Sequence, residues 1–440
     1  MPVCIQAQEL EPAAAWSLES CEKIALERSP IIQAAQYGLD ALQQKYTAAT
    51  WTWFPTFKLR AAATLIPPQG DDEPAEGDPD LSGFNFWSKT ELEVYAPLYT
   101  FGKIAALKRM AKSGVRIGQS VVKLAEEEVI YQVHRAWYGI QLAAELHDVV
   151  NDAESLLRKA RKRIETLEEE DSDDFDQNDV FRLRIHEAEI QDDVLKNKRL
   201  STLSKAGLRV AMGLRKKDLL KIPAKPSKLL PVQLTTKNLE ETIALAGRKR
   251  PELRAAQYKV ALRQANVDRQ FAEFFPDFYL VGSFSFARST VDQEDTVFSK
   301  VSFNATGGAA AIGLQLTLDY PIKVANWKEA KAELAKSESE LQAARDLLGL
   351  EVEKAWLEVQ DQQNLHQFNR RAVRAARSLL VSHVQTYEDG IDENVTLDTI
   401  LGAASTYLKR KAEWLRSVYT FNLGVAQLSR VIGTPMGQNP

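Results

Sequence analysis

The sequence contains one pattern twice, at an offset of about 221 residues. Ala34–Tyr37 recurs as Ala255–Tyr258, and Phe54–Pro55 recurs as Phe275–Pro276. No gap is needed between these matches, so chance is a poor explanation for their order. A duplicated unit folds into the same supersecondary structure twice. We therefore expect two similar halves in this chain of 440 residues.

The repeat sets the domain organisation that we predict. The first structural repeat covers 1–220, and the second covers 238–433. A connector with several prolines, 221–237, joins them, and a short C-terminal tail, 434–440, follows. Each repeat is expected to contain short helices, then a β-hairpin, then a long helical hairpin.

Alternating runs predict the β-hairpins, over 56–96 and 278–320. From Lys58 to Leu65 apolar and polar residues alternate, which is typical of a strand with one buried face. In the second repeat the clearest run is Ala310–Leu318, where leucines alternate with polar residues. Strands of about ten residues can cross a membrane when tilted, although a small soluble sheet has the same pattern. Four strands cannot close a barrel alone, so a membrane sheet would need strands from several chains.

Long helical hairpins are predicted over 103–212 and 326–433. From Lys103 to about Glu170 apolar residues recur every three or four positions, which corresponds to roughly 100 Å of helix at about 1.5 Å per residue. This spacing is typical of coiled-coil packing. The predicted fold class is therefore mainly α with a small β part, built from long antiparallel coiled-coil helices and four strands.

Composition argues against several function classes. The net charge of -4 argues against a nucleic-acid partner, which would call for a basic face. Cys4 and Cys21 are too few for a disulfide framework or a four-ligand zinc site, and the five histidines form no close ligand pair. No phosphate-binding glycine loop or nucleophile motif occurs, and no run of about 18 apolar residues predicts a transmembrane helix. We expect no enzyme activity, no cofactor and no bound metal.

Short motifs in a fixed order carry a family resemblance that covers nearly the whole chain. They are Ser29–Ala35 and its echo Arg250–Ala256, the corners Phe54–Pro55 and Phe275–Pro276, the run Pro97–Gly102, and Tyr387 with Gly390 and Leu397–Asp398. With these motifs the sequence resembles the TolC family of outer-membrane channel proteins of Gram-negative bacteria.

The resemblance implies a homotrimer whose chains each give four transmembrane strands to a twelve-stranded outer-membrane β-barrel, continued through the periplasm by an α-helical barrel. It implies a passive exit duct of a tripartite efflux pump or a type I secretion system, for small molecules or proteins. The implied partners are a periplasmic adaptor protein, an inner-membrane transporter and outer-membrane lipid. The main alternative is a soluble coiled-coil scaffold or adaptor protein. The start of the chain reads as a remnant, so we expect its signal peptide to be missing, and a lipid on Cys4 is left open.

The resemblance also names a periplasmic gate. In the family a tyrosine and aspartates near the second helical turn hold the mouth closed, and these positions match Tyr387 and Asp398. A second family aspartate falls on Leu401. The other acidic candidates for the aperture are Asp389, Asp392 and Glu393. Carboxylates from three chains that converge on one axis would raise one another's pKa and favour cations.

The first helical turn is also acidic. Asp171, Asp173, Asp174 and Asp176 lie there. These carboxylates are candidates for docking a basic adaptor surface at the hairpin tip. The alternative, for this turn as for the second, is that the acids are simply solvated.

Overall fold

The structure is a computed structural model of the chain. The residues it describes are 16–66, 85–170, 175–218, 227–234, 238–290, 304–389, 396–434 and 437–438. The chain divides into two compact units, which we call the sheet unit and the hairpin unit. The sheet unit holds 40–117 and 256–341, and the hairpin unit holds 1–39, 118–255 and 342–440.

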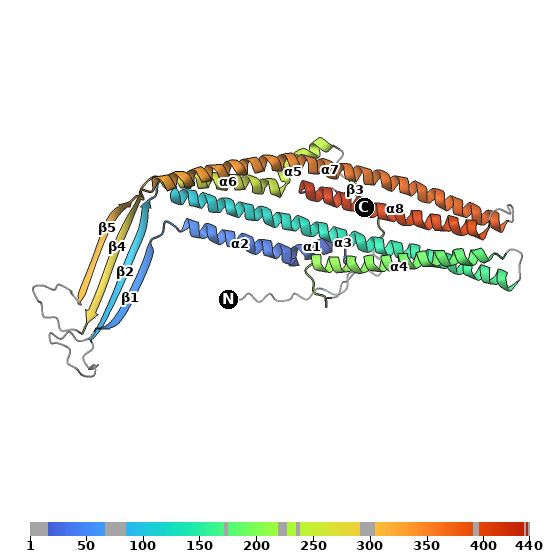
Figure 1. Cartoon of the computed structure of the whole chain (residues 1–440), viewed down its shortest axis with the longest axis horizontal. Coiled ribbons are helices and arrows are strands. Elements are labelled where there is room, and N and C mark those ends of the chain that lie inside the picture. The colour runs from blue at the N-terminus through green and yellow to red at the C-terminus, as the bar shows by residue number, and fades with distance from the viewer. Residues whose placement is uncertain are drawn as a thin grey trace, which may run out of the picture. The chain divides into compact units, whose positions relative to one another are not determined.

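The sheet unit contains an antiparallel sheet with the strand order β1-β2-β4-β5 (Figure 1). The strands are β1 Thr56–Ile66, β2 Asn85–Tyr99, β4 Asp277–Ser289 and β5 Ala305–Gln315. Each repeat supplies one hairpin, and the pairing of β2 with β4 joins the two hairpins. Among the described residues, β1 and β5 therefore pair along one side only, which leaves two open edges.

The two faces of this sheet differ in polarity. Paired residues point to the same face, so the register assigns every side chain. The apolar face carries Phe57, Leu59, Leu65, Phe86, Leu92, Val94, Leu280, Phe284, Phe286, Ile312 and Leu314. The polar face carries Lys58, Arg60, Lys89, Glu91, Glu93, Ser283 and Ser285. The apolar face is uncovered in the single chain, since Leu59 is 71% exposed and Ile312 is 72% exposed.

Four helices connect to the strands and have residues in both units. They are α2 Pro30–Thr50, α3 Lys103–Glu169, α6 Pro251–Ala272 and α7 Tyr320–Glu388. Both α2 and α6 begin with proline, whose fixed φ and missing N–H suit the first turn of a helix. Inside the sheet unit, Arg109 of α3 forms an ion pair with Asp268 of α6 at 2.7 Å. This pair lies on the surface, so it contributes little to stability.

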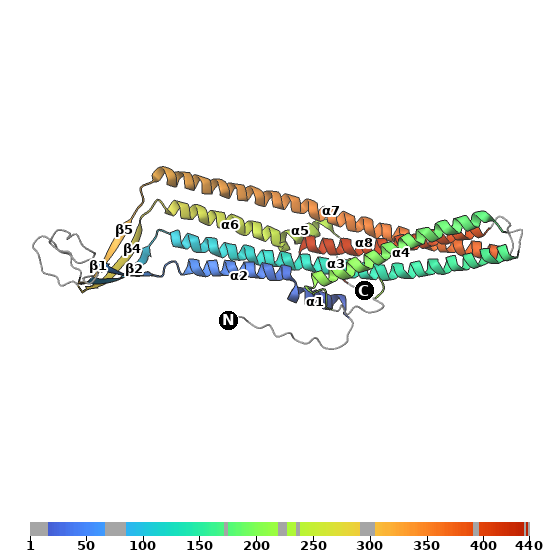
Figure 2. The same cartoon turned by 60° about the horizontal axis from the view of Figure 1, so that its bottom comes forward.

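The hairpin unit contains two antiparallel helical hairpins, α3 with α4 and α7 with α8 (Figures 1 and 2). Its other helices are α1 Leu18–Arg28 and α5 Leu239–Lys249, and the returning helices are α4 Gln177–Ala211 and α8 Leu397–Ile432. One apolar core runs through this unit and includes Val133, Leu208, Val352, Val418 and Leu428, none more than 1% exposed. The two repeats therefore share one core rather than packing as separate domains.

A small second sheet lies near the chain end. The strand β3, Gln233–Leu234, pairs antiparallel with β6, Gly437–Gln438. Beside it, Asn422 of α8 is 1% exposed, and its side chain accepts a hydrogen bond from Val232 N and donates one to Leu230 O. A buried amide with both groups satisfied fixes the connector against α8.

Two boundaries that we predicted in the second repeat differ from those in the structure. We expected a strand over Ala310–Leu318, but β5 spans Ala305–Gln315, because pairing with β4 outweighs the low strand propensity of its glycines and alanines. We expected the long helix to begin at 326, but α7 begins at Tyr320 with Pro321 in its first turn, a position that tolerates proline.

A glycine at the end of α4 gives the first testable prediction. Gly213 has φ +66°, and a Cβ there would lie 2.3 Å from the backbone O of Arg28. We expect Gly213→Ala to destabilise the protein by about 2 kcal/mol or more, because both the backbone conformation and the close approach exclude a side chain. Gly247→Ala is the control, since nothing lies within 4 Å of its Cβ and α5 is helical there. Thermal unfolding followed by circular dichroism measures both, and equal melting temperatures would contradict the assignment.

Candidate functional site

The first candidate site lies at the beginnings of α4 and α8, where the two hairpins return. Asp176 caps α4, and its Oδ1 accepts a hydrogen bond from the backbone N of Asn178 at 2.8 Å. Thr396 precedes α8 without a side-chain cap. Acidic residues at a helix N-terminus are favoured by the helix dipole. Local helix chemistry thus explains why carboxylates gather at these ends.

One arginine links the two hairpins at this point. Arg182, in the second turn of α4, lies 3.3 Å from Asp179 of its own helix and 3.3 Å from Asp398 of α8. All three side chains are partly exposed, and Asp179 is the most buried of them. A shared guanidinium between two carboxylates gives a directional but breakable connection between the helix ends.

The electrostatics of this group are unbalanced. Partial burial raises the pKa of Asp179, and the nearby carboxylates of Asp176 and Asp398 raise it further, while Arg182 opposes them. Asp179 and Asp398 therefore share one guanidinium beside a third carboxylate, Asp176, and the loss of Arg182 would leave the carboxylates around Asp179 to repel one another.

An apolar cluster lies among the same helices. It is formed by Leu157, Ala160, Ile164, Leu183 and Leu401, and Phe175, Val180, Ile190 and Leu397 pack against it. Leu401 is 6% exposed. A leucine buried at this position belongs to the contact between α8 and the first hairpin, so it contributes no charge to an aperture.

The structure places the predicted gate residues unequally. Asp398 is in the ion-pair network described above, Tyr387 is half-buried at the end of α7, and Asp389 is exposed. Among the described ion pairs of the hairpin ends, neither Tyr387 nor Asp389 takes part. Asp392, Glu393, Asp171, Asp173 and Asp174 lie outside the described residues. Asp176 is exposed and serves as the α4 cap.

Sequence reasoning missed Arg182 and Asp179. A usable signal was present, because Asp179 and Arg182 are three positions apart in the predicted helix and therefore lie on the same face of it. No local pattern predicts the partner of Arg182 on α8, because Asp398 is more than 200 residues away in the chain.

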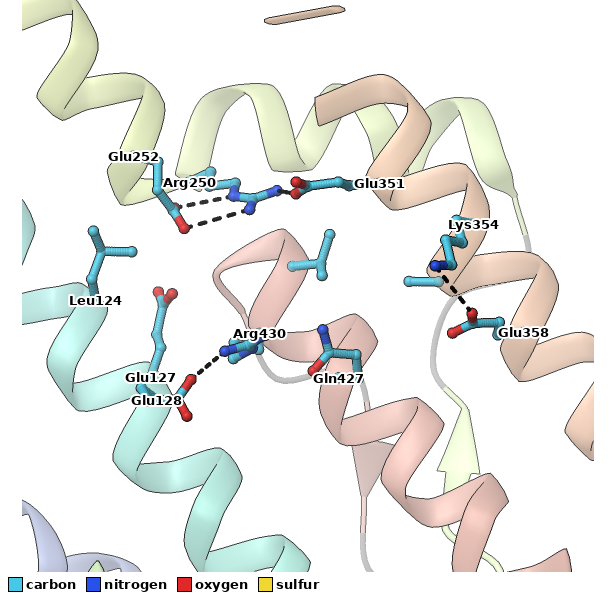
Figure 3. Close-up of a pocket in the computed structure, with 12 residues that line it drawn as sticks. Leu124, Glu127, Glu128, Arg250, Glu252, Glu351, Lys354, Glu358, Gln427 and Arg430 are labelled. Carbon is cyan, nitrogen blue, oxygen red and sulfur yellow. Dashed lines mark hydrogen bonds and ion pairs between the residues drawn. The ribbon is translucent and has the colours of Figure 1, made fainter. Parts of the chain in front are cut away.

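A second site is a charged pocket of about 360 Å³ lined by α3, α6, α7, α8 and the residue that ends α5 (Figure 3). Its charged side chains are Glu127, Glu128, Arg250, Glu252, Glu351, Lys354, Glu358 and Arg430. Arg250 is held by Glu252, 3.0 Å from its Nε, and by Glu351, 2.6 Å from its Nη1. Arg430 pairs with Glu128 and lies over the ring of Tyr131.

Glu127 is the unusual group in this pocket. Among the described residues it forms no ion pair of its own, because the two arginines already serve other carboxylates. Burial and the neighbouring carboxylate of Glu252 raise its pKa to about 7, against the opposing effect of Arg250. Glu127 therefore binds a proton at a higher pH than an ordinary glutamate does.

The structure shows neither a transmembrane helix nor a metal cluster in the part of the chain that it describes. No described helix is both long enough and apolar enough to span a membrane. No described group of three or more His, Cys, Asp or Glu side chains is arranged to hold a metal ion.

The fold is similar to that of known outer-membrane channels. Residues 242–434 match the family described as outer membrane efflux protein. Among solved structures, the outer-membrane channel OprN has a TM-score of 0.76 at 17% identity, with 94% of this chain and 89% of that chain covered. The outer membrane protein VceC from Vibrio cholerae has a TM-score of 0.75 at 18% identity, with 95% and 96% covered. No curated relative matches the sequence.

A third similar structure is of a channel in its open state. The open state of the MtrE outer membrane channel from Neisseria gonorrhoeae has a TM-score of 0.75 at 18% identity, with 95% of this chain and 89% of that chain covered. At these identities the structures show a common fold. Together with the family match over the second repeat, they confirm the resemblance to the TolC family and the predicted fold class.

The charged pocket generates a prediction about pH. The pKa of Glu127 is about 7 in the folded protein and 4.5 as its ordinary value. Between these values the folded chain holds a proton that the unfolded chain has released, so stability falls as pH rises through this window. We expect Glu127→Gln to match the wild type near pH 4 and to be more stable near pH 8 by about 1 kcal/mol, a value discounted for solvent screening at a half-buried site.

Thermal unfolding between pH 4 and pH 8 measures this difference. Glu358→Gln is the control, since it removes another carboxylate from the same pocket and should keep the pH slope of the wild type. A Glu127→Gln curve parallel to the wild-type curve would show that Glu127 does not titrate in this range.

Proposed function

We propose that three copies of this chain form an outer-membrane channel, the passive exit duct of a tripartite efflux pump or a type I secretion system. The observation that carries the proposal is the four-stranded sheet, with one uncovered apolar face and two open edges. A soluble scaffold would have to keep this apolar face in water, which is unfavourable in proportion to its area.

The open edges determine the assembly. Backbone N–H and C=O groups on β1 and β5 need partners, and hydrocarbon offers none. If β1 of one copy pairs with β5 of the next, the arrangement repeats head to tail and closes into a ring. Three copies give twelve strands, an even number within the range of outer-membrane barrels.

The polar face of the sheet is proposed to line the channel. With the apolar face toward lipid, the polar face encloses the lumen, as in other outer-membrane barrels. Arg60 and Glu93, 2.8 Å apart, and Lys89 and Glu91, 3.4 Å apart, then point into water. Charged side chains of both signs suit a conduit for varied cargo, and the choice between small molecules and proteins is left to the transporter.

The helices are proposed to form the periplasmic part of the channel, where its protein partners bind. We propose that the helices of three chains continue the barrel as a tunnel through the periplasm, and that a periplasmic adaptor docks on the hairpins. The acids Asp171, Asp173, Asp174 and Asp176 are the docking candidates at the first turn. An inner-membrane transporter provides the energy, because a channel of this kind performs no chemistry of its own.

The gate is proposed at the second turn. Tyr387 and Asp398 are its principal residues, and the turn acids Asp389, Asp392 and Glu393 add negative charge to the aperture. The link of Asp398 to Arg182 supports this assignment, since it ties α8 to the first hairpin. Breaking the link frees α7 and α8 to move apart from α3 and α4, which widens the mouth.

Planar-bilayer recording tests channel and gate together. We expect the wild type to insert and give small stepwise conductance, and the double variant Tyr387→Phe with Asp398→Ala to give several-fold larger steps. Glu413→Gln is the matched control, because it breaks an ion pair within α8, to Arg410 at 2.7 Å, without touching the link between the hairpins. A wild type that never conducts would refute the channel, and equal steps in wild type and double variant would refute the gate.

A further inference from the structure

The apolar face of the sheet carries one charged side chain among its described residues. Arg288 of β4 is opposite Ser88 of β2 in the register, on the same face as Phe286 and Thr306. The acidic residues Glu91 and Glu93 of the adjacent strand belong to the other face. Arg288 is thus separated from the carboxylates that neutralise arginine elsewhere on the sheet.

Local contacts hold Arg288 on this face. Its Cζ lies 4.4 Å from the centroid of the Phe286 ring, and its Nη1 donates to Ala287 O at 3.0 Å and to Thr306 Oγ1 at 3.5 Å. The side chain is exposed. All these partners are neutral, so among the residues that the structure describes the guanidinium has no carboxylate partner and keeps donors for another group.

The position of Arg288 along the strand matches a membrane border. Phe278 and Arg288 lie on the same face at opposite ends of β4, roughly 34 Å apart at about 3.4 Å per residue. With a strand tilt of about 40°, this corresponds to a height of roughly 26 Å, close to the apolar band of outer-membrane barrels. An arginine at mid-depth would be costly, whereas one at the border is tolerated.

Aromatic side chains mark the opposite border. Trp51, Trp53, Phe54 and Phe57 are all about half exposed, and their rings contact one another where α2 leads into β1. Tryptophan and other aromatic residues concentrate at membrane interfaces. The helix-proximal border therefore carries an aromatic cluster, while the far border of the apolar sheet face carries a cation.

We propose that Arg288 binds the phosphate group of a phosphorylated lipid in the leaflet farther from the helices. The planar guanidinium matches phosphate oxygens in a bidentate arrangement, and the hydroxyl groups of Ser88 and Thr306 on the same face are additional donors. The inference rests on the proposed function, because it requires the apolar face to lie in lipid. It assigns this chain a binding site for one class of lipid.

Lipid binding to the purified trimer tests the site. Lipid A is the probe, and native mass spectrometry measures how much stays bound, with phosphatidylethanolamine for comparison. We expect Arg288→Gln to weaken lipid A binding about tenfold, and Arg288→Lys to retain part of it because a lysine provides charge without the bidentate geometry. Arg60→Gln is the matched control, since it removes an arginine from the other face of the same sheet, and its lipid binding should equal that of the wild type.

Two outcomes would overturn the site. The first is an Arg288→Gln variant that retains lipid A as the wild type does. The second is displacement of lipid A by inorganic phosphate at equal concentration, which would indicate a site for free anions. Conductance of the same preparations separates this inference from the proposed function. If the trimers conduct and the substitution of Arg288 leaves lipid binding unchanged, the lipid site alone is refuted. If the preparations neither insert nor conduct, the channel is refuted.

Discussion

The open edges of one four-stranded sheet are the constraint on which the account depends. A β-strand without a neighbour exposes a row of backbone donors and acceptors, and the adjoining apolar face cannot stay in water. Water would supply hydrogen-bond partners to the strand edges but would leave the apolar face hydrated. Hydrocarbon would cover the apolar face but would leave the backbone groups of the edges without partners. Further copies of the chain satisfy both, because β1 and β5 are the two ends of one strand order and can pair with each other.

The duplication explains how one chain presents such a sheet. Each repeat makes a hairpin, and β2 and β4, one from each repeat, form the central pair. The same duplication gives two helical hairpins that share a core and are tied by Arg182 and Asp398 at their returning ends. The two repeats thus differ at the proposed gate, since Leu401 of the second repeat packs against the first hairpin.

Much of this fold could be predicted from the sequence, because its main signals are periodic. Helical spacing from Lys103 onward and alternation from Lys58 to Leu65 both reflect local burial patterns. The strand β5 was misplaced because its run of glycine and alanine has little alternation, and its bounds come from pairing with β4. The predicted gate and docking roles stay predictions, and the ion pair of Asp398 with Arg182 was not among them. Asp398 was identified through resemblance, but Arg182 and the pocket around Glu127 depend on contacts between distant segments, which no local pattern contains.

Cross-linking between the sheet edges tests the central claim most directly. In a background without Cys4 and Cys21, one cysteine replaces Ala61 on β1 and another replaces Ala310 on β5, both on the apolar face. A short thiol cross-linker applied to membranes should join neighbouring copies of the double variant into a covalent three-chain species, while each single variant stays as separate chains. If the double variant also stays as separate chains in a membrane where it is folded, β1 and β5 of neighbouring copies do not meet, and the shared barrel is contradicted.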